Sequence, residues 1–145
     1  MSGQGTSDRP ADAPRGEITL QTIAMPADSN ANGDIFGGWL MAQMDLGASV
    51  LSRARARGRV ATVAVDAMVF HKPVYVGDVL CTYADIIRVG RTSIAIHIEA
   101  WALRSRQGER VKVTQGTFTL VAIDDVGRPR PVPPEGTTAQ EEPAA

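Results

Sequence analysis

The residue whose setting most suggests chemistry is Asp45, which lies in the apolar stretch WLMAQMDLGASVL. None of the residues three or four positions away is a lysine or an arginine, so no cation at helical spacing can pair with its carboxylate. An unpaired carboxylate is costly to bury, and a catalytic base or nucleophile is one reason for a protein to bear that cost. A carboxylate that points to water at the edge of the apolar stripe, or caps a neighbouring segment, fits the spacing equally well.

Gly37 and Gly38 precede the same stretch. If a helix begins at this pair, its first N–H groups have no partner within the helix, and an acceptor oxygen can approach them closely because no side chains intervene. Such an arrangement has the features of an oxyanion hole, although a flexible connection or a tight crossing against a strand also explains two glycines. Asp45 would lie about 12 Å further along the helix axis, which suggests that a second chain contributes to the site.

The loop before the glycines is unusually polar, with Asn30, Asn32 and Asp34 within five positions. Asn and Asp side chains stabilise turns and helix N-termini through hydrogen bonds to the backbone, and Asn32-Gly33 is itself a turn signal. Three such residues exceed what one turn needs, which favours contact with a ligand.

The remaining reactive groups are few. Cys81 is the single cysteine and lies in an apolar run, so we expect a core thiol and neither an intramolecular disulfide nor a cysteine metal cluster. The two histidines lack metal-ligand spacing; we expect His97 to be structural and His71 to be exposed. The turn VGRTS, residues 89–93, places arginines beside hydroxyls and suits either a phosphate or a solvated hairpin.

One helix and five strands are expected to position these groups. Apolar residues at three- and four-residue steps predict a helix from Trp39 to about Arg53, with Gly58 as its C-terminal cap. Alternating patterns predict strands at residues 17–25, 62–70, 79–88, 92–103 and 111–123. Four consecutive strands with short turns favour an antiparallel sheet, which must bury one face. We therefore expect an α+β domain in which a curved sheet wraps the helix.

The chain as a whole fits one domain. Its 145 residues carry a net charge of −1, which argues against nucleic acid as a partner. Residues 16–134 form the predicted domain, while residues 1–15 and 135–145 have the composition of mobile tails. The sequence contains neither a signal-peptide pattern nor an apolar run long enough to cross a bilayer. We expect a cytoplasmic protein that does not associate with membranes.

Four segments together resemble a known family. They are AMPADSNANGDIFGGWLMAQMD from Ala24 to Asp45, then VAVDAMVFHKPVYVGDVL, VGRTSIAIHIEAW and TFTLVAIDDVGRPRPVP. In this order they resemble the YciA-like acyl-CoA thioesterases of the hotdog superfamily, over about residues 17–134. The resemblance implies a hotdog fold, a long helix wrapped by a five-stranded antiparallel sheet. It also implies dimers joined sheet edge to sheet edge, and hexamers built as trimers of dimers.

The resemblance further implies hydrolysis of an acyl-CoA thioester to a free acid and CoA. No metal or cofactor is implied, because CoA is part of the substrate and product. By position in the motif, Asp45 matches the catalytic carboxylate, as general base or nucleophile, and Asn30 the asparagine that assists from the other subunit. Gly37 and Gly38 match the N–H donors to the thioester carbonyl. A CoA-binding turn is matched by the four consecutive residues Gly90, Arg91, Thr92 and Ser93.

Two other functions use the same fold. A non-catalytic acyl-CoA-binding hotdog module would keep the glycines but needs no carboxylate, so Asp45 speaks against it. A hotdog enoyl-CoA hydratase normally pairs an acid with a histidine, and residues 30–45 contain none. A purely structural assembly unit fits worst with the polar, glycine-rich segment before the helix.

Overall fold

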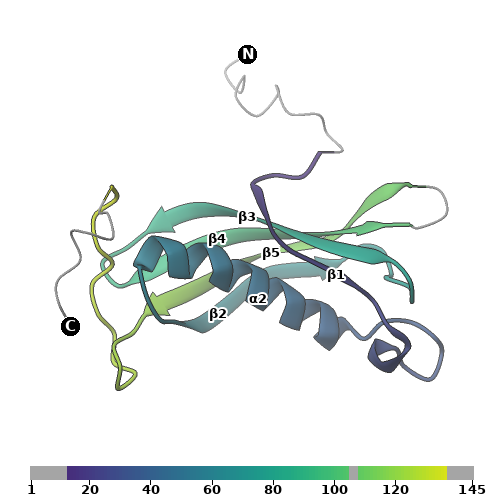
Figure 1. Ribbon diagram of the computed structural model, residues 1–145, viewed down its shortest axis with the longest axis horizontal. Helices are drawn as coiled ribbons and strands as arrows, with labels where there is room; N and C mark the ends of the chain where they lie inside the picture. The colour runs from purple at the N-terminus through teal and green to yellow at the C-terminus, as the bar shows by residue number, and fades with distance from the viewer. Residues whose placement is uncertain (1–12, 105–107, 137–145) are drawn as a thin grey trace, which may run out of the picture.

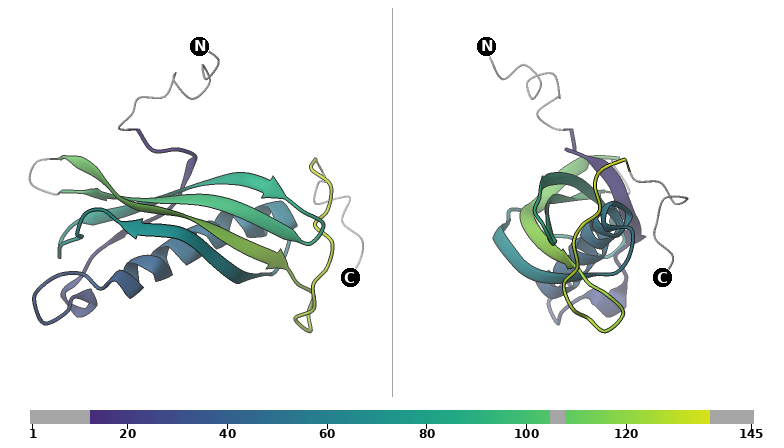
Figure 2. Two further views of the ribbon diagram at one scale, coloured as in Figure 1. Left: turned by 180° about the vertical axis from the view of Figure 1, so that it is seen from behind. Right: turned by 90° about the vertical axis from the view of Figure 1, so that its left-hand side faces the viewer.

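The computed structural model describes residues 13–104 and 108–136. One long helix lies along the concave face of a curved, five-stranded antiparallel sheet, the α+β hotdog arrangement that the sequence predicts (Figure 1). Seen end-on, the sheet curls around the helix (Figure 2). The elements in chain order are β1 (Glu17–Ile23), the short 3-10 helix η1 (Pro26–Asp28), α2 (Gly37–Ala56), β2 (Val60–Phe70), β3 (Val79–Val89), β4 (Ser93–Leu103) and β5 (Arg110–Ala122).

The strand order is β1-β3-β4-β5-β2, so the two strands that flank α2 in sequence lie at opposite edges of the sheet. Strands β3, β4 and β5 follow one another as antiparallel neighbours and form its centre. The chain leaves α2 and returns along β5 as the edge strand β2. Among the described residues, one edge of β2 therefore has no strand partner, and the same holds for β1.

The core lies between α2 and the centre of the sheet. Alternate residues of β4, namely Ile94, Ile96 and Ile98, are completely buried, as expected for one face of a pleated strand. Met44 and Leu40 of α2 belong to the same buried cluster. The sequence pattern for this strand is therefore confirmed. The predicted helix face is confirmed except at Met41, which is 38% exposed.

Gly47 allows the helix to lie close to the sheet. A Cβ atom at this position would fall 2.2 Å from the Thr82 hydroxyl of β3 and 2.8 Å from the Thr19 hydroxyl of β1. These two hydroxyls are 2.9 Å apart and bond to each other, so they are fixed in place. No side chain fits in this space, and the glycine thereby sets the distance between α2 and the β1 edge.

The structure corrects the predicted helix boundaries. The helix is 20 residues long, beginning two residues before Trp39 and continuing three residues past Arg53. The residue that caps the end of the helix in the left-handed conformation is Arg57, with φ of 58°, and not the predicted cap Gly58. The Gly58 N–H does bond to the Arg53 carbonyl, at 3.2 Å.

The apolar alternation in β2 does not mark a face turned to the core. Val63 and Val69 are 59% and 58% exposed, and Val65 is 37% exposed. The pairing of β2 with β5 is interrupted between Asp66 and Val69, where Ala67 has a positive φ of 56°. The pairing is irregular at this bulge, and the edge strand exposes apolar side chains to solvent.

The described part of the chain contains no helix that is long and apolar enough to cross a membrane. Most of the two predicted tails falls on residues outside the described ranges. Arg15, at the end of the predicted N-terminal tail, contacts the sheet: its Nε lies 2.8 Å from Asp85 Oδ2.

Candidate active site

The first turn of α2 leaves its N–H groups open. Phe36 precedes the helix in an extended conformation and provides no side-chain cap. Within the described ranges, the N–H groups of Gly37 and Gly38 have no hydrogen-bond acceptor. A Cβ atom at Gly38 would meet nothing within 4 Å. The positive end of the helix dipole and two donors therefore face an unobstructed space.

The preceding loop is closed by Asn30. Its side-chain oxygen accepts the N–H groups of Asn32 at 2.9 Å and Asp34 at 3.1 Å, and its own N–H bonds to the Asp34 carbonyl at 2.7 Å. The oxygen is thus used by the turn, as expected for an Asn in this setting. The amide NH₂ of Asn30 is the part left to contact a ligand, and it can only donate.

The loop is anchored to a second segment, Pro73–Asp78. The Ile35 N–H donates to the Val74 carbonyl at 3.2 Å. Buried Asp78 accepts the Tyr75 N–H at 2.9 Å and pairs with Arg104, and Arg104 also donates to the Pro73 carbonyl at 3.0 Å. A buried ion pair therefore fixes the backbone that holds the loop before α2.

Asp45 lies two turns into the helix and is half-buried. Its Oδ1 accepts a hydrogen bond from the Thr62 hydroxyl of β2 at 2.5 Å. The carboxylate is therefore neither deeply buried nor without a partner, an outcome between the two that the sequence left open. The Thr62 hydroxyl holds this carboxylate in one orientation.

A small pocket of about 180 Å³ lies beside the start of α2. It is lined mainly by apolar groups, among them Phe36, Leu40, Phe70 and Val74, together with Gly37. A Cβ atom at Gly37 would stand 3.6 Å from the Phe70 ring, so this ring forms the wall nearest to the open N–H groups. An apolar group can occupy the pocket while an attached carbonyl oxygen reaches the helix.

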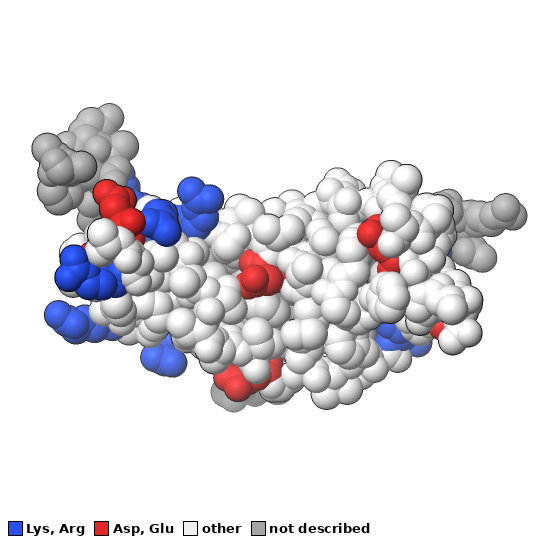
Figure 3. All heavy atoms as spheres, turned by 90° about the horizontal axis from the view of Figure 1, so that it is seen from below, with Lys and Arg blue, Asp and Glu red and all other residues white. Residues whose placement is uncertain are grey.

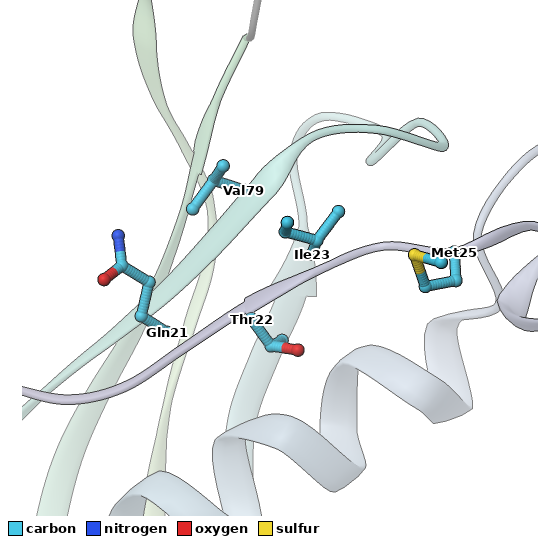
Figure 4. Close-up of a pocket in the computed structure, with 5 residues that line it drawn as sticks. All are labelled: Gln21, Thr22, Ile23, Met25 and Val79. Atoms are coloured by element: carbon cyan, nitrogen blue, oxygen red, sulfur yellow. The ribbon is translucent and has the colours of Figure 1, made fainter.

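A larger and more open groove of about 560 Å³ runs along the β1 edge. Gln21, Thr22, Ile23, Met25 and Val79 line it (Figure 4). None of these side chains is an acid, a base or an activated nucleophile. Size alone does not locate the chemistry, and the smaller pocket beside α2 is the better candidate.

The turn Gly90–Ser93 is not brought near the glycine pair. It joins β3 to β4 at the end of the molecule where α2 ends, and α2 is 20 residues, about 30 Å, long. The Gly90 N–H donates to the Ser93 carbonyl at 2.7 Å, and Arg91 is exposed. Within one chain, the predicted CoA-binding turn and the predicted catalytic residues lie far apart.

The other reactive groups are structural or exposed. Burial raises the pKa of the Cys81 thiol, and His71 is exposed, as predicted. His97 Nε2 lies 2.8 Å from Oε2 of Glu99, a buried carboxylate on the outer face of β4. Burial raises the pKa of Glu99, but hydrogen bonds from His97 and Trp101 outweigh it and bring the value to about 2. Nowhere in residues 13–104 and 108–136 do three His, Cys, Asp or Glu gather as a metal site.

Comparison with known proteins identifies the family. The Thioesterase superfamily model matches residues 32–109. The acyl-CoA thioester hydrolase YciA of Salmonella typhimurium is 53% identical over 126 residues, which span 85% of this chain and 95% of that protein. The chain belongs to the YciA-like acyl-CoA thioesterases of the hotdog superfamily. This family membership confirms the resemblance read from the four sequence segments.

Solved structures of YciA-like and related thioesterases have the same fold. A hexameric thioesterase of Yersinia pestis is 55% identical, with a TM-score of 0.81 over 84% of this chain and 99% of that one. An acyl-CoA hydrolase of Staphylococcus aureus, solved with butyryl-CoA and CoA, is 29% identical, with a TM-score of 0.72 over 79% of this chain and 70% of that one. That hydrolase has also been solved as an aspartate-to-alanine and as an asparagine-to-alanine mutant.

The sequence missed two supporting residues. Thr62 and Asp45 are 17 positions apart, and only the placement of β2 beside α2 brings them together. A signal was nonetheless present, because Thr62 is a hydroxyl in an apolar strand directly after a helix whose carboxylate lacks a cation. Arg104, which supports the loop before α2, has no comparable signal.

Proposed function

We propose that this protein is an acyl-CoA thioester hydrolase whose reacting carbonyl binds at the start of α2. The observation that carries the proposal is the pair of open N–H groups at Gly37 and Gly38. They stand beside an apolar pocket, on a helix that also presents the hydroxyl-held carboxylate of Asp45. Donors for a developing oxyanion, space for an acyl group and a carboxylate base are the parts that metal-free thioester hydrolysis requires.

The thioester oxygen accepts hydrogen bonds from the two N–H groups, which stabilise the negative charge that develops on it. In one route, Asp45 takes a proton from water as the water oxygen attacks the carbonyl carbon. The tetrahedral intermediate then expels CoA as a thiolate, which receives that proton. In the other route, Asp45 attacks the carbonyl carbon itself, CoA leaves, and water hydrolyses the resulting anhydride. The Asn30 amide NH₂ donates to the water or to the carboxylate and orients it.

The mutants of the S. aureus hydrolase support these assignments. The substituted asparagine and aspartate stand 15 positions apart in that protein, the same separation as between Asn30 and Asp45. The two pairs therefore correspond in spacing as well as in residue type.

The distance along α2 supports a site shared between two chains. Gly38 and Asp45 are seven residues apart, or about 10 Å along the axis, too far for both to act on one carbonyl carbon. Exposed valines of β2 and the exposed Leu46 and Val50 of α2 lie on neighbouring elements that are joined by the Thr62–Asp45 bond, and these apolar side chains suit a second copy of the chain. Two β2 strands that pair antiparallel about a two-fold axis place their helices side by side and antiparallel. The start of one α2 then approaches Asp45 of the other.

The hexameric relatives support a trimer of such dimers. In this assembly we propose that the Gly90–Ser93 turn, remote from the catalytic groups within one chain, binds CoA at a site in another subunit. We also propose that hydrolysis requires no metal or cofactor, a point that dialysis against a chelator tests. The cytoplasmic location stays a prediction from the sequence.

Thiol release from acyl-CoAs of increasing chain length, by the unaltered protein and by Asp45→Asn, tests the function. We expect hydrolysis by the unaltered protein and a loss of roughly 10²–10⁴-fold in the variant, the usual contribution of a general base. Asp125→Asn, which neutralises an exposed carboxylate, serves as the matched control and should retain full activity. Near-normal turnover by a folded Asp45→Asn oligomer would refute the mechanism.

Two other outcomes would replace the proposed function. CoA binding without hydrolysis of any acyl-CoA would indicate a binding module. Hydration of an enoyl-CoA, with saturated acyl-CoA untouched, would indicate a hydratase.

A further inference from the structure

The segment after β5 crosses the end of the molecule where α2 ends (Figures 1 and 2). This C-terminal strap, residues 124–134, is held mainly by arginines that donate to backbone carbonyls. Arg55 of α2 donates to the Pro133 carbonyl at 2.6 Å, and Arg59 donates to the Asp125 carbonyl at 3.0 Å. In the opposite direction, Arg130 of the strap donates to the carbonyl of Ala56, the last residue of α2, at 2.9 Å.

The strap also reaches the turn between β3 and β4. The Val132 N–H donates to the Arg91 carbonyl at 2.8 Å. The Ala122 N–H, at the end of β5, donates to the Thr92 carbonyl at 2.9 Å. Both carbonyls of the two central turn residues are therefore held from the C-terminal side of the molecule.

These bonds fix the direction of the N–H groups in the turn. The Arg91 carbonyl and the Thr92 N–H belong to one planar trans peptide unit and point in opposite directions. When Val132 holds this carbonyl, the Thr92 N–H is aimed away from the strap. It has no acceptor among the residues that the structure describes.

The surroundings of this open donor are basic. Arg88 and Arg91 are exposed, and a Cβ atom at Gly90 would lie 3.7 Å from the Arg88 guanidinium. On the face drawn in Figure 3, Lys and Arg side chains gather mainly at the end where α2 ends. Backbone N–H groups beside guanidinium groups form a site suited to phosphate oxygens.

We propose that the C-terminal strap positions the Gly90–Ser93 turn for the phosphate-bearing nucleotide end of CoA, with Val132 as the positioning residue. The inference rests on the proposed function, because it concerns how CoA is bound. The sequence of the strap supports it. In Pro131-Val132-Pro133-Pro134, Val132 carries the only backbone N–H, and that N–H is the one that bonds to the turn. The prolines keep this part of the strap extended and stiff.

The test compares Val132→Pro, which removes the N–H, with Val132→Ala, which keeps it and removes the half-buried side chain. Each variant is assayed as the full-length oligomer with butyryl-CoA and with S-butyryl-N-acetylcysteamine, a thioester that lacks the nucleotide. We expect Val132→Pro to raise KM for butyryl-CoA about tenfold, the effect of one lost hydrogen bond, with kcat little changed. For the truncated thioester, kcat/KM should stay within about twofold, and Val132→Ala should resemble the unaltered protein with both substrates.

A structural role alone would give a different pattern. Equal losses with both substrates, or equal effects of the two variants on KM for butyryl-CoA, would overturn the inference. If Val132→Pro does not fold, Arg55→Met loosens the strap one residue away, at Pro133, and the same comparison of substrates decides.

Failure of the proposed function can be distinguished from failure of this inference. If the unaltered protein hydrolyses neither thioester, that function is wrong, and titration calorimetry with CoA still tests the strap. Weaker CoA binding by Val132→Pro than by Val132→Ala would support the inference, and equal binding would refute it.

Discussion

The two ends of α2 differ in whether their backbone groups find hydrogen-bond partners outside the helix. At its start, no side chain caps the helix, and the Gly37 and Gly38 N–H groups have no acceptor in the described part of the chain. At its end, Arg57 adopts the left-handed conformation, the Gly58 N–H bonds to the Arg53 carbonyl, and Arg130 bonds to the Ala56 carbonyl. Every helix has N–H groups at its start and carbonyl groups at its end that lack partners within the helix. In α2, the described residues supply such partners only at the end.

This difference separates function from stability along one element. The completed end joins the helix to the strap and contributes to the free energy of unfolding. The open end lacks the stabilisation of a cap, which is typically about 1 kcal/mol, and in the proposed function its donors bind the thioester oxygen. Substitutions at the start of α2 should therefore lower turnover. Substitutions of residues whose polar groups are hydrogen-bonded within the fold should lower the free energy of unfolding.

Among the substitutions that test this difference between the helix ends, the largest effect is expected for Gly37→Pro. Proline is tolerated at the first position of a helix, and Phe36, with ψ of 137°, already has the conformation that favours a following proline. The substitution removes one proposed oxyanion donor, so kcat should fall about 10²–10³-fold while the unfolding midpoint changes little. Gly37→Ala, which keeps the N–H, is the control. Equal losses in both variants would attribute the effect to bulk near Phe70 and remove the donor from the mechanism.

Glu99, on the outer face of the sheet, is a second group whose hydrogen bonds are satisfied within the fold, and it can be compared with the open start of α2. Its carboxylate accepts hydrogen bonds from Trp101 at 2.9 Å and from the Arg15 N–H at 3.1 Å, in addition to His97, and Lys112 lies 3.5 Å away. Against burial, which raises the pKa, these contacts lower it from 4.5 to about 2. The carboxylate therefore stabilises the fold above pH 4.5, by about 3 kcal/mol, and this stability is lost as the pH falls towards 2.

Urea unfolding at pH 7 and pH 3 measures this contribution. We expect the free energy of unfolding to fall between the two values in the unaltered protein, and to fall less in Glu99→Gln. Turnover at pH 7 by Glu99→Gln should stay near normal, provided that it folds. A specific loss of kcat in a stable variant would show that the outer face and the active site are not independent.

The smallest effect is expected at the completed end of α2. Arg130→Met removes the bonds to the Ala56 and Ile123 carbonyls, and should lower the free energy of unfolding by about 1–2 kcal/mol with kcat unchanged. Arg128→Met is the matched control, because Arg128 is 78% exposed and pairs with Asp124 only at 3.9 Å. A comparable loss of stability in both variants would mean that the bond from Arg130 to the Ala56 carbonyl does not stabilise the end of the helix.

Local patterns predicted much of the fold. The alternation of Ile94, Ile96 and Ile98 gave the buried face of β4, since period-two burial is a local property. The end of α2 was placed too early, because its last carbonyl is capped by Arg130, 74 positions away. The alternation in β2 indicated a strand, but Val63 and Val69 are exposed, so alternation alone did not show which residues pack on the core.

The residues of the candidate site likewise divide into those that local patterns indicated and those that they did not. Residue types and spacing singled out Asp45 and the glycine pair, because unpaired carboxylates and glycines before a helix are unusual locally. Among the three polar residues of the loop, only the family resemblance singled out Asn30. The sequence left a turn and a ligand as alternative roles for the polar loop, and the structure shows that the Asn30 oxygen serves the turn and that its NH₂ is left for a ligand. Thr62 required the tertiary structure.

The arginine-to-carbonyl bonds of the strap have a consequence for its response to solvent. Peptide carbonyls do not titrate, and arginine stays protonated at every pH at which proteins fold. The bonds from Arg55, Arg59 and Arg130 therefore persist through the acid range in which Glu99 loses its charge. Added salt, which screens exposed ion pairs, weakens these contacts less, because one partner in each bond carries no net charge. The contact between helix and strap should thus survive in acid and be less sensitive to salt than an exposed ion pair.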